Sequence, residues 1–165
     1  MAVVHFICGP PGAGKTTYAM ALADRAKAIR FTIDEWIATL FVADRPPTAS
    51  LAWALERTAR CEAQMWPIAD RLLERGVDVV FDLGVSRRDH RDRFRARASE
   101  TRASIKMHYL DVPRDTRRAR VHARNAQRTG TYAFEVTDAM FDWMEQWFEL
   151  PSDDELYGAM IVCDS

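Results

Sequence analysis

The chain has little of what marks secreted, metal-binding or strongly nucleic-acid-binding proteins. It holds 3 cysteines in 165 residues, and Cys8, Cys61 and Cys163 lack the spacing of metal ligands. An odd number of thiols without such spacing favours reduced, buried cysteines in a cytoplasmic protein. The formal net charge of −1 argues against tight non-specific binding of nucleic acid, although it leaves room for a local basic patch.

Long apolar runs are missing as well. No stretch is long enough to span a bilayer, and the chain starts without the basic segment and cleavage site of a secretory signal, so we expect neither a membrane protein nor a secreted one. Internal repeats and low-complexity segments are absent. Hydrophobic residues make up 48% and charged residues 28%, and this composition and length predict one compact domain over residues 1–165.

What the chain does contain is a phosphate-binding motif near its start. Residues 9–16 match the pattern G-x-x-x-x-G-K-[ST]. Its glycines let the backbone wrap around phosphates, and N–H groups at the start of the following helix favour anions. The lysine of such a loop reaches the β- and γ-phosphates, and the next hydroxyl ligates Mg²⁺. The predicted nucleotide-binding residues are Gly9, Pro10, Pro11, Gly12, Ala13, Gly14, Lys15, Thr16 and Thr17, with Thr16 also a metal ligand.

The surroundings of the motif predict an α/β fold. Residues 3–8 are an apolar run typical of a buried strand, and residues 17–23 are good helix formers. Further strands are expected at 29–32, 77–83, 105–112 and 160–163, with helices from 34 and over about 50–75, 87–102, 114–128 and 137–148. This alternation indicates a mostly parallel, roughly five-stranded sheet. Pro67 should kink or divide the long helix.

Two aspartates follow predicted strands, at the edge where open α/β sheets bind ligands. Asp34 follows the second strand, where a carboxylate could take the proton of an attacking hydroxyl. The structural alternative is a capping box formed by Thr32 and Glu35, which would leave Asp34 free for catalysis. Asp82 ends the third strand and is a candidate for holding Mg²⁺ or its waters, the alternative being a cap of the turn before Gly84.

Arginines on the helix over residues 114–128 form the third candidate group. Arg117, Arg120, Arg124 and Arg128 share one helical face, which on its own is often only a solvated surface. Arg124 and Arg128 differ because they border a glycine-containing loop at 129–132. Guanidinium groups on a closing loop can stabilise the charge of a transferring phosphoryl group. We therefore predict a helical lid around residues 124–137 with Arg124 and Arg128 as catalytic residues.

Two other clusters leave alternatives open. Four arginines lie within residues 87–93, at a helix start where cations are unfavourable without an anion nearby. Either an anionic ligand or the aspartates of the same stretch could compensate them. The aromatic residues Trp143, Trp147 and Phe148 have helical spacing, which favours a place in the core over a platform for a nucleobase.

With these pieces together, the chain resembles the small P-loop predicted kinases, an AAA-type ATP-binding family related to polynucleotide 5′-kinases, zeta-type toxins and chloramphenicol phosphotransferases. The resemblance rests on residues 9–16, the segment 34–36, the strand ending in Asp82, and residues 124–130, which together extend over most of the chain. Residues 148–155 also look like the closing stretch of that group, which implies a place near the adenine.

The resemblance implies a three-layer P-loop kinase fold that uses ATP and Mg²⁺. It implies Asp34 as general base and lid arginines Arg124 and Arg128 on the phosphates. Polynucleotide kinases carry an arginine shortly after the catalytic acid, and this chain has Ile37 there, which puts a nucleic-acid 5′-end in doubt as acceptor. We expect a kinase acting on a hydroxyl of a small molecule or nucleic-acid end. The alternatives are a nucleotide-dependent regulatory NTPase and a toxin or antibiotic-modifying kinase.

Overall fold

Strands and helices alternate along the chain in the computed structural model, which describes residues 1–128 and 135–163. The elements in chain order are β1 (Val3–Cys8), α1 (Lys15–Ala26), β2 (Ile29–Thr32), α2 (Ile33–Phe41), α3 (Leu51–Leu73), β3 (Val79–Asp82), α4 (Arg88–Ser99), β4 (Ser104–Asp111), α5 (Arg114–Gln127), α6 (Asp138–Trp147), α7 (Asp153–Leu156) and β5 (Met160–Cys163). The predicted α/β class is confirmed.

The five strands form one sheet in the order β2-β3-β1-β4-β5, and every pairing is parallel. In the central strand, Val4 lies opposite Val79 of β3 and Ile105 of β4. The connections that follow the neighbouring strands β1 and β3 run in opposite directions across the sheet. The connection after β1 leads to β2, and the connection after β3 leads to β4. Ligands of such sheets bind at the carboxyl ends of the strands where the connections diverge, so the fold places the site beyond the ends of β1, β2 and β3.

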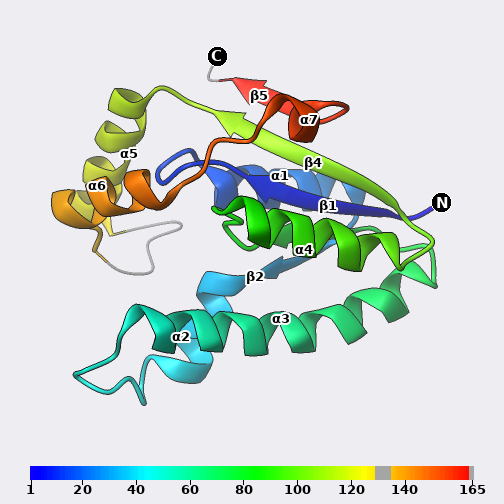
Figure 1. Ribbon diagram of the computed structural model, residues 1–165, viewed down its shortest axis with the longest axis horizontal. Coiled ribbons are helices and arrows are strands. Elements are labelled where there is room, and N and C mark those ends of the chain that lie inside the picture. Colours follow the sequence, from blue (N-terminus) through cyan, green and yellow to red (C-terminus); the bar gives the residue numbers. More distant parts are fainter. Residues whose placement is uncertain (129–134, 164–165) are drawn as a thin grey trace.

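Helices cover both faces of the sheet and produce three layers (Figure 1). Ile7 and Val80 belong to the cluster that packs against α1 on one face. On the other face, rings of the strands meet rings of α3 and α4, with Phe6 and Phe94 centroids 5.1 Å apart and those of Trp66 and Phe81 4.7 Å apart. Burial on both faces explains why β1 and β3 have nearly continuous apolar runs.

A smaller cluster joins α5 and α6 away from the main core. Val121 of α5 packs with Phe141 of α6 and with Val136, which precedes that helix. Figure 1 shows these two helices side by side at one end of the sheet. Within the described parts of the chain, none of the helices is both long and apolar enough to cross a membrane.

The elements agree with the sequence except in a few places. β3 begins at Val79 because Val77 still belongs to the turn that follows α3, where its N–H donates to the Leu72 carbonyl at 3.0 Å. The helix α3 continues through the exposed Pro67 and is not divided there. The short helix α7 was not predicted, because its four residues are too few to give a periodic pattern.

Candidate active site

The phosphate-binding loop has a backbone that depends on glycine. Gly12 and Gly14 have φ values of 74° and 89°, a region that side chains rarely adopt. At Gly12 an added Cβ would lie 2.6 Å from the carbonyl oxygen of Arg117, so the loop also needs glycine to pack against α5. Gly14 is the N-cap of α1 and provides no side-chain cap. The first N–H groups of this helix therefore suit an anion.

Lys15 lies folded back against the loop. Its Nζ donates to the carbonyl oxygens of Gly9 and Pro10, both at 2.9 Å. Burial lowers the pKa of Lys15, while the nearby Asp82 opposes that change. In a buried setting with only two neutral carbonyls as partners, the charged ammonium group would be strongly stabilised by an anion.

Asp82 ends β3 as a buried carboxylate. Burial raises its pKa, and a hydrogen bond from Thr16 and the charge of Lys15 act in the opposite direction. Arg30 of β2 forms an ion pair with it at 3.3 Å. The hydroxyl of Thr16 and the carboxylate of Asp82 are thus brought together, as predicted, and oxygen donors of this kind are those that Mg²⁺ prefers. The two residues fit a magnesium site.

Asp34 stands in the first turn of α2, directly after β2. It is exposed, and its charge adds to the rise in the pKa of Asp82. The expected capping box is wrong: Thr32 is the N-cap but its side chain makes no capping hydrogen bond, and Glu35 instead pairs with Arg30 at 2.5 Å. Because its carboxylate is engaged by Arg30, Glu35 does not cap the start of α2.

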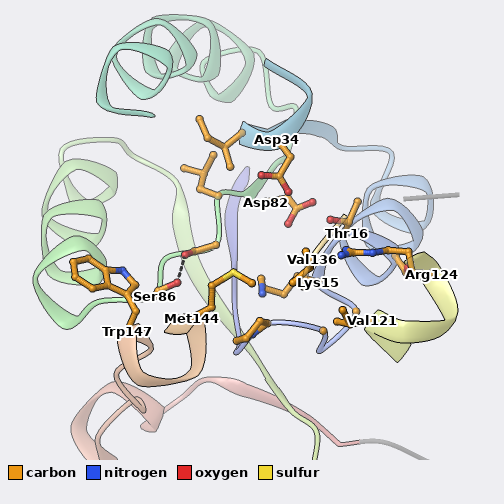
Figure 2. A pocket seen from close by; sticks show the side chains of 17 residues that line it. Lys15, Thr16, Asp34, Asp82, Ser86, Val121, Arg124, Val136, Met144 and Trp147 are labelled. Carbon is orange, nitrogen blue, oxygen red and sulfur yellow. Dashed lines mark hydrogen bonds between the residues drawn. The ribbon is translucent and has the colours of Figure 1, made fainter. Parts of the chain in front are cut away.

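One cavity, of about 310 Å³, collects most of these groups. Figure 2 shows Asp34, Asp82, Thr16 and Lys15 around it, with Arg124 and Trp147 at opposite ends. The lining residues are Pro11, Gly12, Gly14, Lys15, Thr16, Thr17, Ile33, Asp34, Asp82, Leu83, Gly84, Ser86, Val121, Arg124, Val136, Met144 and Trp147. Gly9, Pro10 and Ala13 of the loop are buried and do not line this cavity.

The two predicted lid arginines differ in position. Arg124 lines the cavity, and its buried Nε has no hydrogen-bond partner among the residues that the structure describes. Arg128 caps the end of α5 with φ 50°, is exposed, and is not among the residues that line the cavity. The predicted loop at 129–132, and residues 129–134 of the predicted lid, lie outside the described residues.

Arg117 has a role that the sequence did not reveal. Its guanidinium is buried, donates to the carbonyls of Val112 at 2.8 Å and Pro11 at 3.1 Å, and forms a two-point ion pair with Glu145 of α6. It therefore fastens the phosphate-binding loop to α5 and α6. An arginine in a run of arginines gives no sign of such burial; the one available signal was the acidic Glu145 on a neighbouring amphipathic helix.

A second cavity, of about 530 Å³, lies on the other side of the loop. Tyr18 and Ala21 of α1, Leu110 and Val112 around the end of β4, and Val162 of β5 give it a largely apolar wall. Arg120 and Arg124 of α5 border it as well. Since Gly12, Gly14 and Thr17 line both cavities, a nucleotide could extend from one into the other.

The arginines at the start of α4 are compensated from within the protein. Arg88 pairs with Asp154 at 2.7 Å, and Arg91 with Glu155 at 2.7 Å, both side chains of the latter pair being fully buried. Burial, the largest single influence, would by itself raise the pKa of Glu155. The hydrogen bonds from Arg91 and the Ser152 backbone, together with the charges of Arg91 and Arg95, outweigh it and lower the pKa to about 2. Residues 148–155 thus hold α4 in place through ion pairs, which gives this stretch a structural role in addition to the expected place near the adenine.

The aromatic prediction is correct for Phe148 and wrong for the two tryptophans. Phe148 packs against the main core. Trp143 is 47% exposed and stacks on Trp147, with ring centroids 5.6 Å apart and planes 14° apart. Trp147 lines the first cavity, and the guanidinium of Arg87 lies 4.8 Å from its ring centroid. Helical spacing could not show that this face of α6 turns toward a cavity.

Comparison with known proteins supports the fold. A family model described as an AAA domain matches residues 4–151. A sugar kinase from Janibacter sp. HTCC2649 superposes with a TM-score of 0.67 at 17% identity, over 99% of this chain and 86% of that one. Kti12 of Chaetomium thermophilum, in complex with ADP-AlF3, gives 0.69 at 17% identity, over 98% and 88%.

The APS kinase of Mycobacterium tuberculosis, in complex with AMPPNP and APS, superposes with a TM-score of 0.64 at 16% identity, over 99% of this chain and 89% of that one. No curated protein matched the sequence. At these identities the superpositions show the fold, and the family match extends over nearly the whole chain. The chain belongs to the AAA domain family and has the fold of the P-loop kinases.

Proposed function

We propose that the protein is an ATP- and Mg²⁺-dependent kinase that transfers the γ-phosphoryl group to a hydroxyl of an acceptor. The observation that carries the proposal is the convergence of Lys15, the Thr16–Asp82 pair, Asp34 and Arg124 on one cavity. Each group suits one task of phosphoryl transfer, namely holding the phosphates, placing the metal, aligning the nucleophile and stabilising the transferring charge.

In the proposed reaction, Asp34 accepts the proton of the acceptor hydroxyl while the oxygen of that hydroxyl bonds to the γ-phosphorus. The bond between that phosphorus and the β–γ bridging oxygen breaks, and ADP leaves with the electron pair. Lys15 exchanges its two backbone carbonyls for phosphate oxygens, and the guanidinium of Arg124, which lines the cavity, acts on the transferring group. Thr16 and Asp82 would hold Mg²⁺, which would neutralise phosphate charge. Arg128 and a lid around 124–137 complete the proposal.

In this proposal the nucleoside of ATP binds in the second cavity. It adjoins the loop beside α1, has apolar walls suited to a flat base, and is separate from the side on which Asp34 lies. The relatives in complex with ADP-AlF3 and AMPPNP add support for nucleotide use.

The assignment of Asp34 is tested by comparing Asp34→Asn with Lys15→Ala. We expect Asp34→Asn to bind ATP as the unchanged protein does but to lose on the order of 10² to 10⁴ in transfer to the acceptor. Lys15→Ala should weaken ATP binding itself. Transfer that survives in Asp34→Asn but not in Lys15→Ala would show that the carboxylate is only structural.

The rival function is a nucleotide-dependent regulatory NTPase, in which a water takes the place of the acceptor hydroxyl. Acceptor-independent ATP hydrolysis at the same rate across panels of metabolites and oligonucleotides would favour it. A toxin or antibiotic-modifying kinase would differ in its acceptor alone, and growth arrest or altered drug tolerance on expression would reveal it.

A further inference from the structure

A cavity of about 430 Å³ adjoins the catalytic one on the side away from the nucleotide. Both cavities are lined by Leu83, Gly84, Ser86 and Trp147, so they meet at the loop that follows β3. In Figure 2, Ser86 and Trp147 lie at the end of the catalytic cavity opposite Arg124. A molecule whose hydroxyl is at Asp34 could therefore extend past Ser86 into this second space.

The walls of the adjoining cavity come from two helices. One face of α3, with Leu55, Thr58, Ala59 and Glu62, lies across from the first turns of α4. These positions are spaced by three and four residues, so they form a single stripe along α3. The stripe contains one small, one apolar and two polar side chains, which is a surface for a ligand with both apolar and hydrogen-bonding groups.

The ionic groups of α4 in this cavity are already compensated by carboxylates. Arg87 pairs with Glu149 at 2.9 Å, and Arg93 pairs with Asp89 at 2.8 Å. Among the residues that line this cavity, each arginine thus has a carboxylate partner, and Glu62 adds a further negative charge. The charge pattern therefore favours a neutral acceptor over a phosphorylated one.

The polar contact best placed for recognition is the pair formed by Glu62 and His90. Glu62 Oε1 and His90 Nε2 are 2.8 Å apart, and each side chain is 19% exposed at the cavity. A carboxylate can accept several hydrogen bonds, so Glu62 keeps capacity for ligand hydroxyls while His90 fixes its orientation. Trp147 adds an aromatic wall held by Trp143 and Arg87.

We propose that this cavity binds the part of the acceptor remote from the reacting hydroxyl, and that the acceptor is an uncharged, hydroxyl-rich ring compound bound through Glu62 and His90. The inference rests on the proposed kinase function and specifies its substrate class. Glu62 and His90 are specificity-determining residues, because they act on a part of the acceptor that does not react.

The first experiment measures transfer from γ-labelled ATP to two matched sets of compounds. The neutral set contains hexoses, N-acetylhexosamines and inositol, and the charged set contains their monophosphates and a 5′-hydroxyl oligonucleotide. We expect labelled product from the neutral set and little from the charged set. Preference for the charged set would overturn the inference while leaving the kinase function intact. No product from either set, with ATP still bound, would overturn both.

The second experiment tests the cavity with variants on α3 and α4, using the neutral compound that is phosphorylated best. Glu62→Gln and His90→Gln should raise the KM for that compound about tenfold or more, with kcat and the Kd for ATP little changed. Ala59→Phe should act likewise by filling the space without removing a polar group. Glu56→Gln, on the same helix but paired with Arg57 and Arg60 outside the cavity, is the control. Equal KM values in all four variants and the unchanged protein would overturn the inference.

Discussion

Arg117 of α5 and Glu145 of α6 form a two-point ion pair that also reaches the phosphate-binding loop, since the same guanidinium donates to the Pro11 carbonyl at 3.1 Å. The position of the loop is thus coupled to the packing of two helices that are distant from it in sequence. The guanidinium is nearly buried, so the geometry of the fork matters more here than the charge.

Arg117→Lys should therefore weaken nucleotide binding although it keeps the charge. A lysine cannot make the two-point contact and still donate to Val112 and Pro11, and we expect a loss of about tenfold in affinity for ATP. Isothermal titration with a non-hydrolysable ATP analogue measures it. Arg118→Lys is the matched control, because Arg118 pairs with Asp138 and Asp142 on α6. Equal affinities for the two variants would contradict the coupling.

A second prediction concerns the lid arginine. Arg124→Ala should lower kcat by on the order of 10² to 10³ with a smaller effect on the Kd for ATP, because the side chain acts on charge that grows as the phosphoryl group transfers. Single-turnover kinetics separate the two quantities. Arg102→Ala, exposed and far from the cavity, serves as the control. An unchanged kcat in Arg124→Ala would remove this residue from the catalytic set, and Arg128→Ala would then test the other lid arginine.

The strands and the phosphate-binding motif could be predicted because they depend on local patterns. The run over residues 3–8 is buried on both faces and apolar except for His5, and the glycines of the loop indicate a backbone with positive φ. Asp34 and Asp82 could be placed because parallel strands bring their carboxyl ends to the same edge of the sheet. These inferences need no knowledge of which helix faces which.

The remaining contacts depend on pairings between distant segments. Arg91 reads as one of several arginines on a charged helix, yet it is fully buried against Glu155, 64 residues away. Glu35 has the spacing of a capping residue, but Arg30 lies within reach in the folded chain. Trp147 has core-like spacing and lines a cavity. In each case a tertiary partner outweighs the local pattern.

The Arg91–Glu155 pair gives a third prediction, on stability. Glu155→Ala would leave a buried guanidinium without its carboxylate, and breaking such a pair costs about 3–5 kcal/mol in the free energy of unfolding. Chemical denaturation measures the loss. Asp153→Ala changes an exposed acid of the same short helix and should stay within about 0.5 kcal/mol. A loss below about 1 kcal/mol for Glu155→Ala would mean that solvent reaches Arg91.

The last prediction concerns pH and a buried chain of polar groups between the sheet and α1. His108 Nε2 lies 2.9 Å from His5 Nδ1, and its Nδ1 lies 2.9 Å from the Tyr18 hydroxyl. Burial lowers the pKa of His108 to about 4, with the charges of His5, Lys106 and Arg25 adding to the effect. Burial likewise lowers the pKa of His5, although Asp78 opposes it.

A histidine with a lowered pKa binds fewer protons when folded than when unfolded. The contribution of His108 to stability should therefore be constant above about pH 7 and fall as the pH drops from about 6.5 to 4, by roughly 3 kcal/mol. Denaturation curves across this range measure the slope. His108→Gln should flatten it in part, since His5 still contributes. A slope that is the same in His108→Gln and in the unchanged protein would show that His108 takes up its proton in the folded state as readily as in the unfolded chain.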